Sequence, residues 1–246
     1  MMKLNEVLKE YRLVDLSETV AQGESAGPTG EQRWYFTRMF PFPPGQVGGE
    51  WMHIIVMESH VGTHVEAPAH WIDAAENREG AGKDVSQIPL TSYFGEAILI
   101  KCSNLPDGEA ISAEFLKREG VRKGDIVVFG LSGRDMFSGK APYVSDEAVR
   151  YMADLPIKMV AFDRTVGVED MPRFMGEKDV RKRFLGMVMH RTFCSRDIPI
   201  IECIGNLEKL TKKRFFLFAW PAPMKGLESF VIRAVAFEPL NEADDG

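Results

Sequence analysis

Three of the five histidines of this chain lie within one short segment, HVGTHVEAPAHW (60–71). His60, His64 and His70 share it with one carboxylate, Glu66. Two imidazoles and a carboxylate suit Zn²⁺ or Mn²⁺ and leave coordination positions open for water. A chance cluster of polar residues on a solvated loop is the alternative. The residue types favour a divalent metal site, with Zn²⁺ as the first choice and Mn²⁺ as the second.

The spacing of His60 and His64 restricts how the segment folds. In a straight strand, at about 3.3 Å per residue, they would be about 13 Å apart. Ligands of one zinc ion need nitrogens about 2.0–2.1 Å from the metal. A bend or helical turn must therefore separate them, and Gly62 stands where the chain must bend. Pro68 is expected to end any helix and to project His70 from a new direction. Val61 excludes the HExxH metalloprotease motif.

A second pair of candidate ligands lies far along the chain. Glu202 ends the apolar run IPIIE (198–202), and His190 precedes it. Proteins with α/β folds usually place functional groups at the carboxyl ends of buried strands. The alternative is that Glu202 is an exposed strand end and His190 a helix-end residue. Spacing alone leaves both interpretations open.

Composition excludes some classes of function. A net charge of -6 and a pI near 5.5 argue against a nucleic-acid binder. The chain shows no signal-like or membrane-spanning apolar run, which predicts a cytoplasmic protein without a membrane partner. Three cysteines without a CxxC pair give no disulfide framework and are expected to be buried, inert thiols: Cys102, Cys194 and Cys203.

Strand and helix signals alternate through the middle of the chain. Ser112 is a good N-cap for a helix to about Gly120, and Ser145 caps another that stops before Pro156. The N-terminal residues 1–17 read as a short helix running into a strand. Seven runs rich in β-branched or aromatic residues predict strands at 53–57, 97–102, 125–131, 158–163, 198–203, 215–221 and 231–237. This alternation predicts an α/β fold with a central mixed sheet in one domain spanning 1–246.

The histidine segment resembles a known signature. HVGTHVEAPAHW is similar to the HxGTHxDxPxH motif of the metal-dependent cyclase family, which includes bacterial kynurenine formamidase (arylformamidase) and isatin hydrolase. Weaker resemblances follow in the family's order at VDLSETV (14–20), DVSQIPLTSYFGEAILI (84–100), MHRTFCSRDIPIIECIGNLEKL (189–210) and RAVA (233–236).

The resemblance implies a swivelling β/β/α fold, a homodimer or homotetramer, and a two-metal site in the formamidase branch. His60 and His64 would hold the first ion, and Glu66 would stand where the family has a bridging Asp. The second ion would be completed by His190 and Glu202. His70 would be the catalytic base and acid.

Several positions depart from the family pattern. Glu66 is one methylene longer than the family's Asp. Three further segments differ, and these are expected to lie near bound substrate: Leu131 to Arg134, DRTVGVED (163–170, which keeps Asp163), and Ser229 to Val231. The family's substrates therefore do not transfer directly to this chain.

The expected chemistry is hydrolysis of an amide-type C–N bond by metal-activated water, with His70 moving the proton. The leading hypothesis is arylformamidase-like activity in tryptophan catabolism, from N-formylkynurenine to kynurenine and formate. One alternative is hydrolysis of a cyclic amide, imide or lactone, as in isatin hydrolase. Another is a catalytically silent metal-binding or ligand-sensing protein. Candidate contacts to this small-molecule substrate are the aromatic residues Trp34, Phe40 and Trp71, and the arginines Arg38, Arg134 and Arg164.

Overall fold

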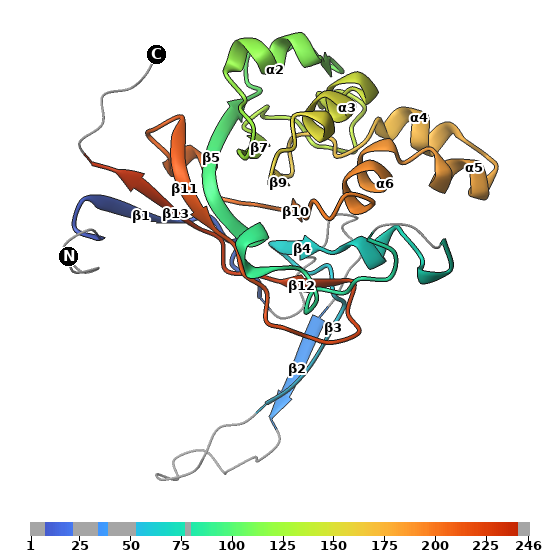
Figure 1. Ribbon diagram of the computed structural model, residues 1–246, viewed down its shortest axis with the longest axis horizontal. Helices are drawn as coiled ribbons and strands as arrows, with labels where there is room; N and C mark the ends of the chain where they lie inside the picture. The colour runs from blue at the N-terminus through green and yellow to red at the C-terminus, as the bar shows by residue number, and fades with distance from the viewer. Residues whose placement is uncertain (1–7, 22–33, 39–52, 77–79, 241–246) are drawn as a thin grey trace.

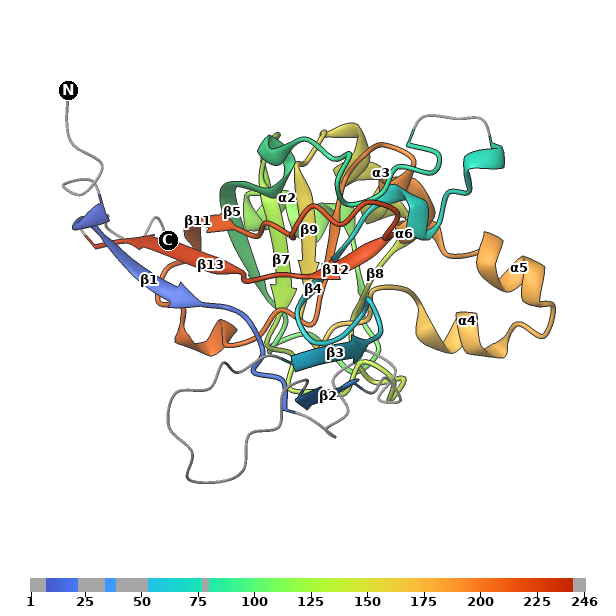
Figure 2. The same ribbon diagram turned by 90° about the horizontal axis from the view of Figure 1, so that it is seen from below.

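The computed structural model describes residues 8–21, 34–38, 53–76 and 80–240. A nine-stranded mixed sheet dominates this part of the chain, in the order β1-β13-β11-β5-β7-β9-β10-β4-β12 (Figures 1 and 2). Its strands are β1 (Tyr11–Asp15), β4 (His64–Glu66), β5 (Phe94–Lys101), β7 (Ile126–Gly130), β9 (Met159–Phe162), β10 (Ile200–Glu202), β11 (Arg214–Phe218), β12 (Ser229–Val231) and β13 (Val235–Pro239). Strands β5, β7, β9 and β10 run parallel, and the other pairings are antiparallel.

Helices and two small sheets complete the fold. The α-helices are α2 (Ala113–Glu119), α3 (Asp146–Asp154), α4 (Met171–Gly176), α5 (Val180–Leu185) and α6 (Val188–Cys194). Short 3₁₀ helices are η1 (Pro68–His70), η2 (Ala74–Glu76), η3 (Leu90–Tyr93) and η4 (Leu207–Lys209). Strands β2 (Trp34–Arg38) and β3 (His53–Met57) form a ribbon that projects from the body (Figure 1), and β6 (Ala110–Ile111) pairs with β8 (Tyr143–Val144). Within the described ranges, no helix has both the length and the apolarity to cross a membrane.

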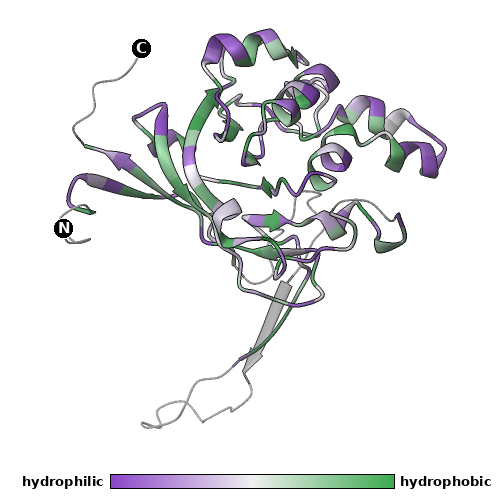
Figure 3. Cartoon of the chain, viewed as in Figure 1, coloured by the Kyte–Doolittle hydropathy of each residue, from purple (hydrophilic) through white to green (hydrophobic). Residues whose placement is uncertain are grey.

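The central strands are buried on both faces, as their continuous apolar runs predict. Along β7, Val127 and Phe129 pack into the cluster under α2, α3 and α6, while Ile126 and Val128 face the opposite cluster. In the hydropathy view (Figure 3) these inner strands are hydrophobic, and hydrophilic residues gather on the outer helices. The metal-ligand candidates thus lie on a well-packed framework.

The predicted helix boundaries are confirmed. The Ser112 side chain accepts the backbone N–H of Phe115, and Gly120 ends α2 in the left-handed conformation with φ 83°. Ser145 caps α3 in the same way through the N–H of Ala148. Each cap satisfies a backbone N–H in the first helical turn, so both helices begin where the sequence predicts.

One strand prediction is wrong. The run 231–237 is two strands, because β12 ends at Val231 and β13 begins at Val235. β12 pairs with β4 at one end of the strand order, whereas β13 pairs with β1 and β11 at the other. Since only residues 232–234 connect them, the sheet must curl until its two ends approach each other.

Candidate metal centre

The predicted bend between His60 and His64 lies at Gly62, whose φ is +60°. That conformation favours glycine, and a Cβ there would lie 2.6 Å from Cγ2 of Val20. After the bend the chain enters β4, where His64 and Glu66 alternate onto one face. Gly62 therefore allows the two histidines to approach, with ring centroids 5.0 Å apart.

His70 reaches the same site by a different local route from the predicted one. Pro68 does not end a helix; it begins the 3₁₀ helix η1, of which His70 is the last residue. Proline is tolerated there because backbone N–H groups in the first turn of a helix have no partner within the helix, so the N–H that proline lacks is not needed. This turn brings Nε2 of His70 within 3.4 Å of Oε1 of Glu66.

His190 and Glu202 come to the site from the far part of the chain. His190 lies inside α6, not at its end, and is 4% exposed. Glu202 is the last residue of β10, is 7% exposed, and pairs directly with His64 of β4. The interpretation of Glu202 as an exposed strand end is therefore wrong.

Glu66 lies at the centre of the cluster. Its Oε1 atom is 3.5 Å from Nε2 of His60 and 3.8 Å from Nε2 of His64, and its Oε2 atom is 3.5 Å from Nε2 of His190. Glu202 faces the same space, with Oε1 3.5 Å from Nε2 of His190 and Oε2 3.8 Å from Nε2 of His64. The five predicted ligands and His70 thus converge on one point.

Several of these buried atoms lack a hydrogen-bond partner among the residues that the structure describes. They are Nε2 of His60, Nε2 of His64 and Oε2 of Glu66. An unsatisfied buried polar group costs about 1–3 kcal/mol, so native proteins rarely keep several together without a ligand. Potential ligand atoms within 4.8 Å of one another form two sets that share Glu66: His60, His64 and Glu66, and Glu66, His190 and Glu202. The donor set fits one or two divalent cations of the Zn²⁺ or Mn²⁺ type.

Hydrogen bonds on the far side of the rings orient the imidazoles. Nδ1 of His64 lies 2.8 Å from the carbonyl oxygen of Gly62, so this nitrogen donates and Nε2 keeps its lone pair. Nδ1 of His190 lies 3.0 Å from Oε1 of Glu169 and likewise donates, which fixes the orientation of this ring. Sequence reasoning missed Glu169 as an orienting residue, although it belongs to the divergent segment DRTVGVED.

Burial and nearby charges shift the pKa values of His70 and His190 in opposite directions. Burial alone would raise the pKa of Glu66, but the imidazoles of His70 and His190 hold it well below its ordinary value. Burial would lower the pKa of His190, yet the Glu66 and Glu169 carboxylates raise it well above the usual value. For His70 burial prevails and its pKa is lowered, which favours the neutral imidazole that a base requires.

An aromatic wall borders the cluster. The ring of Trp71 lies 5.4 Å from that of His70 and 5.0 Å from that of His190, measured between centroids. Phe184 of α5 packs on Trp71 at 5.4 Å and is 48% exposed. Phe184 was not among the predicted substrate contacts, because neither composition nor spacing links α5 to the histidine segment.

The other predicted substrate contacts are less informative. Trp34 and Arg38 belong to β2, for which the structure describes the backbone but not the side chains. Phe40 lies outside the described residues. Arg134 donates to Asp107 and to the carbonyl oxygens of Ser132 and Leu105. Arg164 pairs with Glu18 at 2.6 Å. Both arginines therefore have structural partners.

The retained Asp163 and the cysteines also have structural roles. Asp163 accepts the N–H of Leu131 and both the N–H and the hydroxyl of Thr165, which joins two divergent segments. All three cysteines are free and buried, as predicted. Burial raises the pKa of the Cys102 thiol to about 12, which makes it a poor nucleophile.

The fold is α/β, with a curled mixed sheet. A buried cluster of histidines and glutamates, which could hold a metal ion, lies at the β4–β10 pair. The model of the Cyclase family matches residues 14–170, and this chain belongs to that family.

Similar proteins agree with this assignment. Kynurenine formamidase of Geobacillus thermodenitrificans (strain NG80-2) is 24% identical over 150 residues, which are 61% of this chain and 67% of the relative. An isatin hydrolase bound to the product analogue thioisatinate has a TM-score of 0.73 at 17% identity, covering 97% of this chain and 100% of that one. Isatin hydrolase A from Labrenzia aggregata has a TM-score of 0.72 at 19% identity, covering 96% and 99%. At these identities the solved structures establish the shared fold.

Proposed function

We propose that this protein is a metal-dependent hydrolase that cleaves an amide-type C–N bond, with N-formylkynurenine as the leading substrate and kynurenine and formate as products. The observation that carries the proposal is the trio of unpartnered buried atoms on His60, His64 and Glu66, with His70 beside them. A purely structural metal site has no need of a neutral imidazole facing the ligand carboxylate. The kynurenine formamidase relative supports the choice of substrate.

The ligand assignment follows the two sets that share Glu66. His60, His64 and Glu66 would hold one divalent ion, and Glu66, His190 and Glu202 a second. When bound, such an ion supplies a water of lowered pKa and polarises a carbonyl oxygen. The two oxygens of Glu66 face different histidines, because Oε1 lies 3.5 Å from Nε2 of His60 and Oε2 lies 3.5 Å from Nε2 of His190.

His70 is the residue assigned to proton transfer. Its side chain is 24% exposed, so a substrate can reach the ring, and its lowered pKa favours the neutral form. Hydrolysis adds one water across the C–N bond: the oxygen goes to the carbonyl carbon and a proton to the nitrogen. His70 would take a proton from the attacking water and return it to the leaving nitrogen, so that it ends the cycle neutral.

The aromatic wall supports a substrate with an aryl group. Trp71 and Phe184 present ring surface next to His70 and His190. Aryl rings pack on such surfaces in offset or edge-to-face geometry, worth about 0.5–1.5 kcal/mol per pair beyond the buried area. A substrate held there would place its carbonyl group beside His70.

The second candidate function is hydrolytic ring opening of a cyclic amide such as isatin, whose aryl group would pack on the same aromatic wall. Similarity to isatin hydrolases over nearly the whole chain favours it. The test is side-by-side hydrolysis of N-formylkynurenine and isatin by protein reconstituted with Zn²⁺ or Mn²⁺, with metal-free protein as control. Metal-dependent turnover of one compound selects between the candidates. Tight metal binding without turnover of either would reject both and favour a metal-binding or ligand-sensing role.

We also propose that the protein assembles as a homodimer or homotetramer. Strand β3 supports this, because Ile54, Ile55 and Val56 are 47%, 60% and 45% exposed on the projecting ribbon (Figure 1). Contiguous exposed apolar side chains often mark protein–protein contacts. Light scattering coupled to gel filtration would show two or four copies, and a monomer would contradict the proposal.

A further inference from the structure

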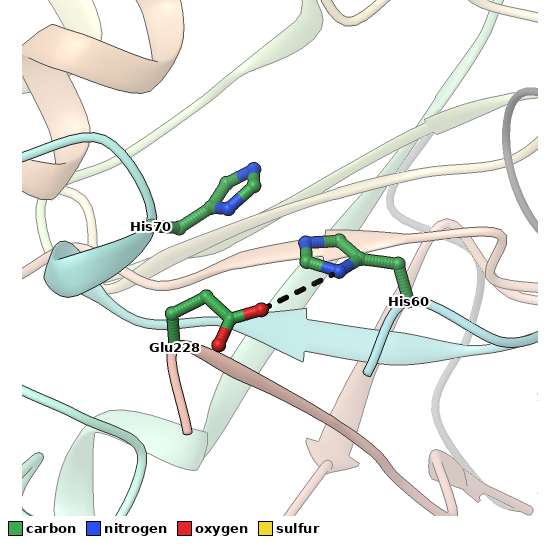
Figure 4. Close-up of side chains that lie close together, drawn as sticks. All are labelled: His60, His70 and Glu228. Atoms are coloured by element: carbon green, nitrogen blue, oxygen red, sulfur yellow. Dashed lines mark ion pairs between the residues drawn. The ribbon is translucent and has the colours of Figure 1, made fainter. Parts of the chain in front are cut away.

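His60 has an orienting contact that differs from those of the other histidines. Its Nδ1 atom lies 3.0 Å from the hydroxyl oxygen of Ser59, and this hydroxyl lies 2.5 Å from Oε1 of Glu228. Glu228 directly precedes β12 and points toward His60 beside the ring of His70 (Figure 4). The direct separation between Nδ1 of His60 and Oε1 of Glu228 is 3.8 Å. Ser59 thus lies between a histidine ring and a carboxylate.

The proton count in this arrangement has one consistent solution. A serine hydroxyl carries a single hydrogen, and an ionised carboxylate can only accept. Ser59 therefore donates to Glu228 and must accept from His60, which places a hydrogen on Nδ1. The lone pair is then on Nε2, the buried atom that lacks a partner and faces Glu66 at 3.5 Å.

The position of Ser59 is itself fixed. Its backbone carbonyl oxygen accepts the hydroxyl of Ser229, 3.2 Å away, on the neighbouring strand β12. The backbone carbonyl of Glu228 also accepts the N–H of Ala67, at 2.8 Å. Both Ser59 and Glu228 are therefore tied to the β4–β12 pairing that carries His64 and Glu66.

A direct ligand role for Glu228 is the competing interpretation. His60, His70 and Glu228 offer potential ligand atoms within 4.8 Å of one another. However, Nδ1 is the nitrogen of His60 nearest to Glu228, and it already bonds to Ser59. Nε2 remains for the ion, on the side of Glu66. The contacts favour Glu228 acting through Ser59.

We infer that Ser59 and Glu228 form a positioning pair that fixes the ring orientation and tautomer of His60 for metal binding. This inference rests on the proposed metal centre. Without Glu228, the Ser59 hydroxyl is free to donate to Nδ1, which favours a hydrogen on Nε2 and blocks the ligand nitrogen. Partners of this kind typically change metal affinity by about 10–100-fold. Because Glu228 is one-third exposed, water replaces part of the effect, and about tenfold is expected.

The test is a double-mutant cycle read by metal binding. Zn²⁺ and Mn²⁺ affinity and stoichiometry are measured by competition with a chromophoric chelator for the wild type, Ser59→Ala, Glu228→Ala and the double variant. Each single variant should weaken binding about tenfold, and the double variant no further, because both remove the same arrangement. Ser59→Thr retains a hydroxyl and should restore most of the affinity. Glu114→Gln, an exposed carboxylate on α2, is the matched control.

The outcomes separate this inference from the proposed function. Wild-type protein that binds neither metal would reject the metal centre, and the inference with it. Tight wild-type binding that is unchanged in both alanine variants would reject the inference alone. Loss of one bound ion in Glu228→Ala, but not in Ser59→Ala, would identify Glu228 as a direct ligand and overturn the positioning role.

Discussion

Oε1 of Glu169 lies 3.0 Å from Nδ1 of His190 and also 3.0 Å from the backbone nitrogen of His190, whose N–H donates to it. One carboxylate oxygen therefore fixes both the start of α6 and the ring that faces Glu66 and Glu202. Removing it in Glu169→Ala should weaken binding of the ion assigned to His190 by about 10–100-fold. Metal titration should then show one weakened site and one unchanged site. Equal weakening in the exposed control Glu147→Gln would show that the loss is not specific.

His70→Ala should separate metal binding from catalysis. The variant removes the proton-transfer group but none of the five assigned ligands, so kcat should fall by about 10²–10⁴-fold. Metal content, measured by elemental analysis, should stay at the wild-type value. Full turnover would exclude the base role, whereas loss of an ion would show that His70 is a ligand.

Removal of metal should affect stability as well as activity. Buried atoms of His60, His64 and Glu66 lack hydrogen-bond partners within the described part of the chain. A cation that binds them only in the folded state would stabilise that state. At a free metal concentration 100-fold above Kd this contribution is about 2.7 kcal/mol. Thermal unfolding should therefore show a lower Tm after chelation and recovery when Zn²⁺ or Mn²⁺ is returned. An unchanged Tm would argue against a resident ion.

Phe184 offers a test of the aromatic wall with a neighbour as control. Phe184→Ala removes the ring that packs on Trp71. It should raise KM several-fold and leave kcat nearly unchanged, because Phe184 is neither a proposed ligand nor the proton-transfer residue. Leu185, the next residue in α5, is similarly exposed, at 55%, but has no aromatic ring. Leu185→Ala should leave both constants at wild-type values. Equal effects of the two substitutions would point to a general disturbance of α5.

Glu238 predicts a pH dependence of stability remote from the metal centre. It is 1% exposed and accepts hydrogen bonds from Arg12 and from the backbone N–H groups of Thr211 and Lys212. Burial opposes ionisation, but these donors hold its pKa below the ordinary value of 4.5. A lowered folded-state pKa stabilises the protein above the unfolded pKa, and this stabilisation is lost as the pH falls through the folded value.

Glu238→Gln should therefore lower the free energy of unfolding at pH 7 by about 1–3 kcal/mol. The difference in unfolding free energy between the variant and the wild type should shrink as the pH falls below about 4.5. Denaturant unfolding of metal-free protein at pH 7 and at a pH below about 4.5 measures this difference. The exposed Glu96 on β5 provides the control Glu96→Gln, with little change at either pH. A difference that grows toward acid pH would contradict the assigned role of Glu238.

Local chemistry explains which features were predictable. Ser112, Gly120 and Ser145 act on backbone groups a few residues away, so both helices could be placed from their caps. Gly62 was predictable as a bend because the two histidines of a shared site require one. The break between β12 and β13 was not, because the run 231–237 is uniformly suited to strand. Its division depends on which strands it pairs with at the two ends of the curled sheet.

The candidate site shows the same division. The sequence by itself predicted the candidate ligand types, their spacing at His60, His64 and Glu66, and the two distant candidates His190 and Glu202. Only the tertiary structure decided that Glu169 orients His190, that Glu228 reaches His60 through Ser59, and that Phe184 borders the site. Metal-ligand residue types and local bends are encoded over a few residues. Orienting partners are set by contacts between distant segments. Glu228 and Ser59, for example, are more than 100 residues apart in the chain. They meet only because the curled sheet brings β12 beside β4.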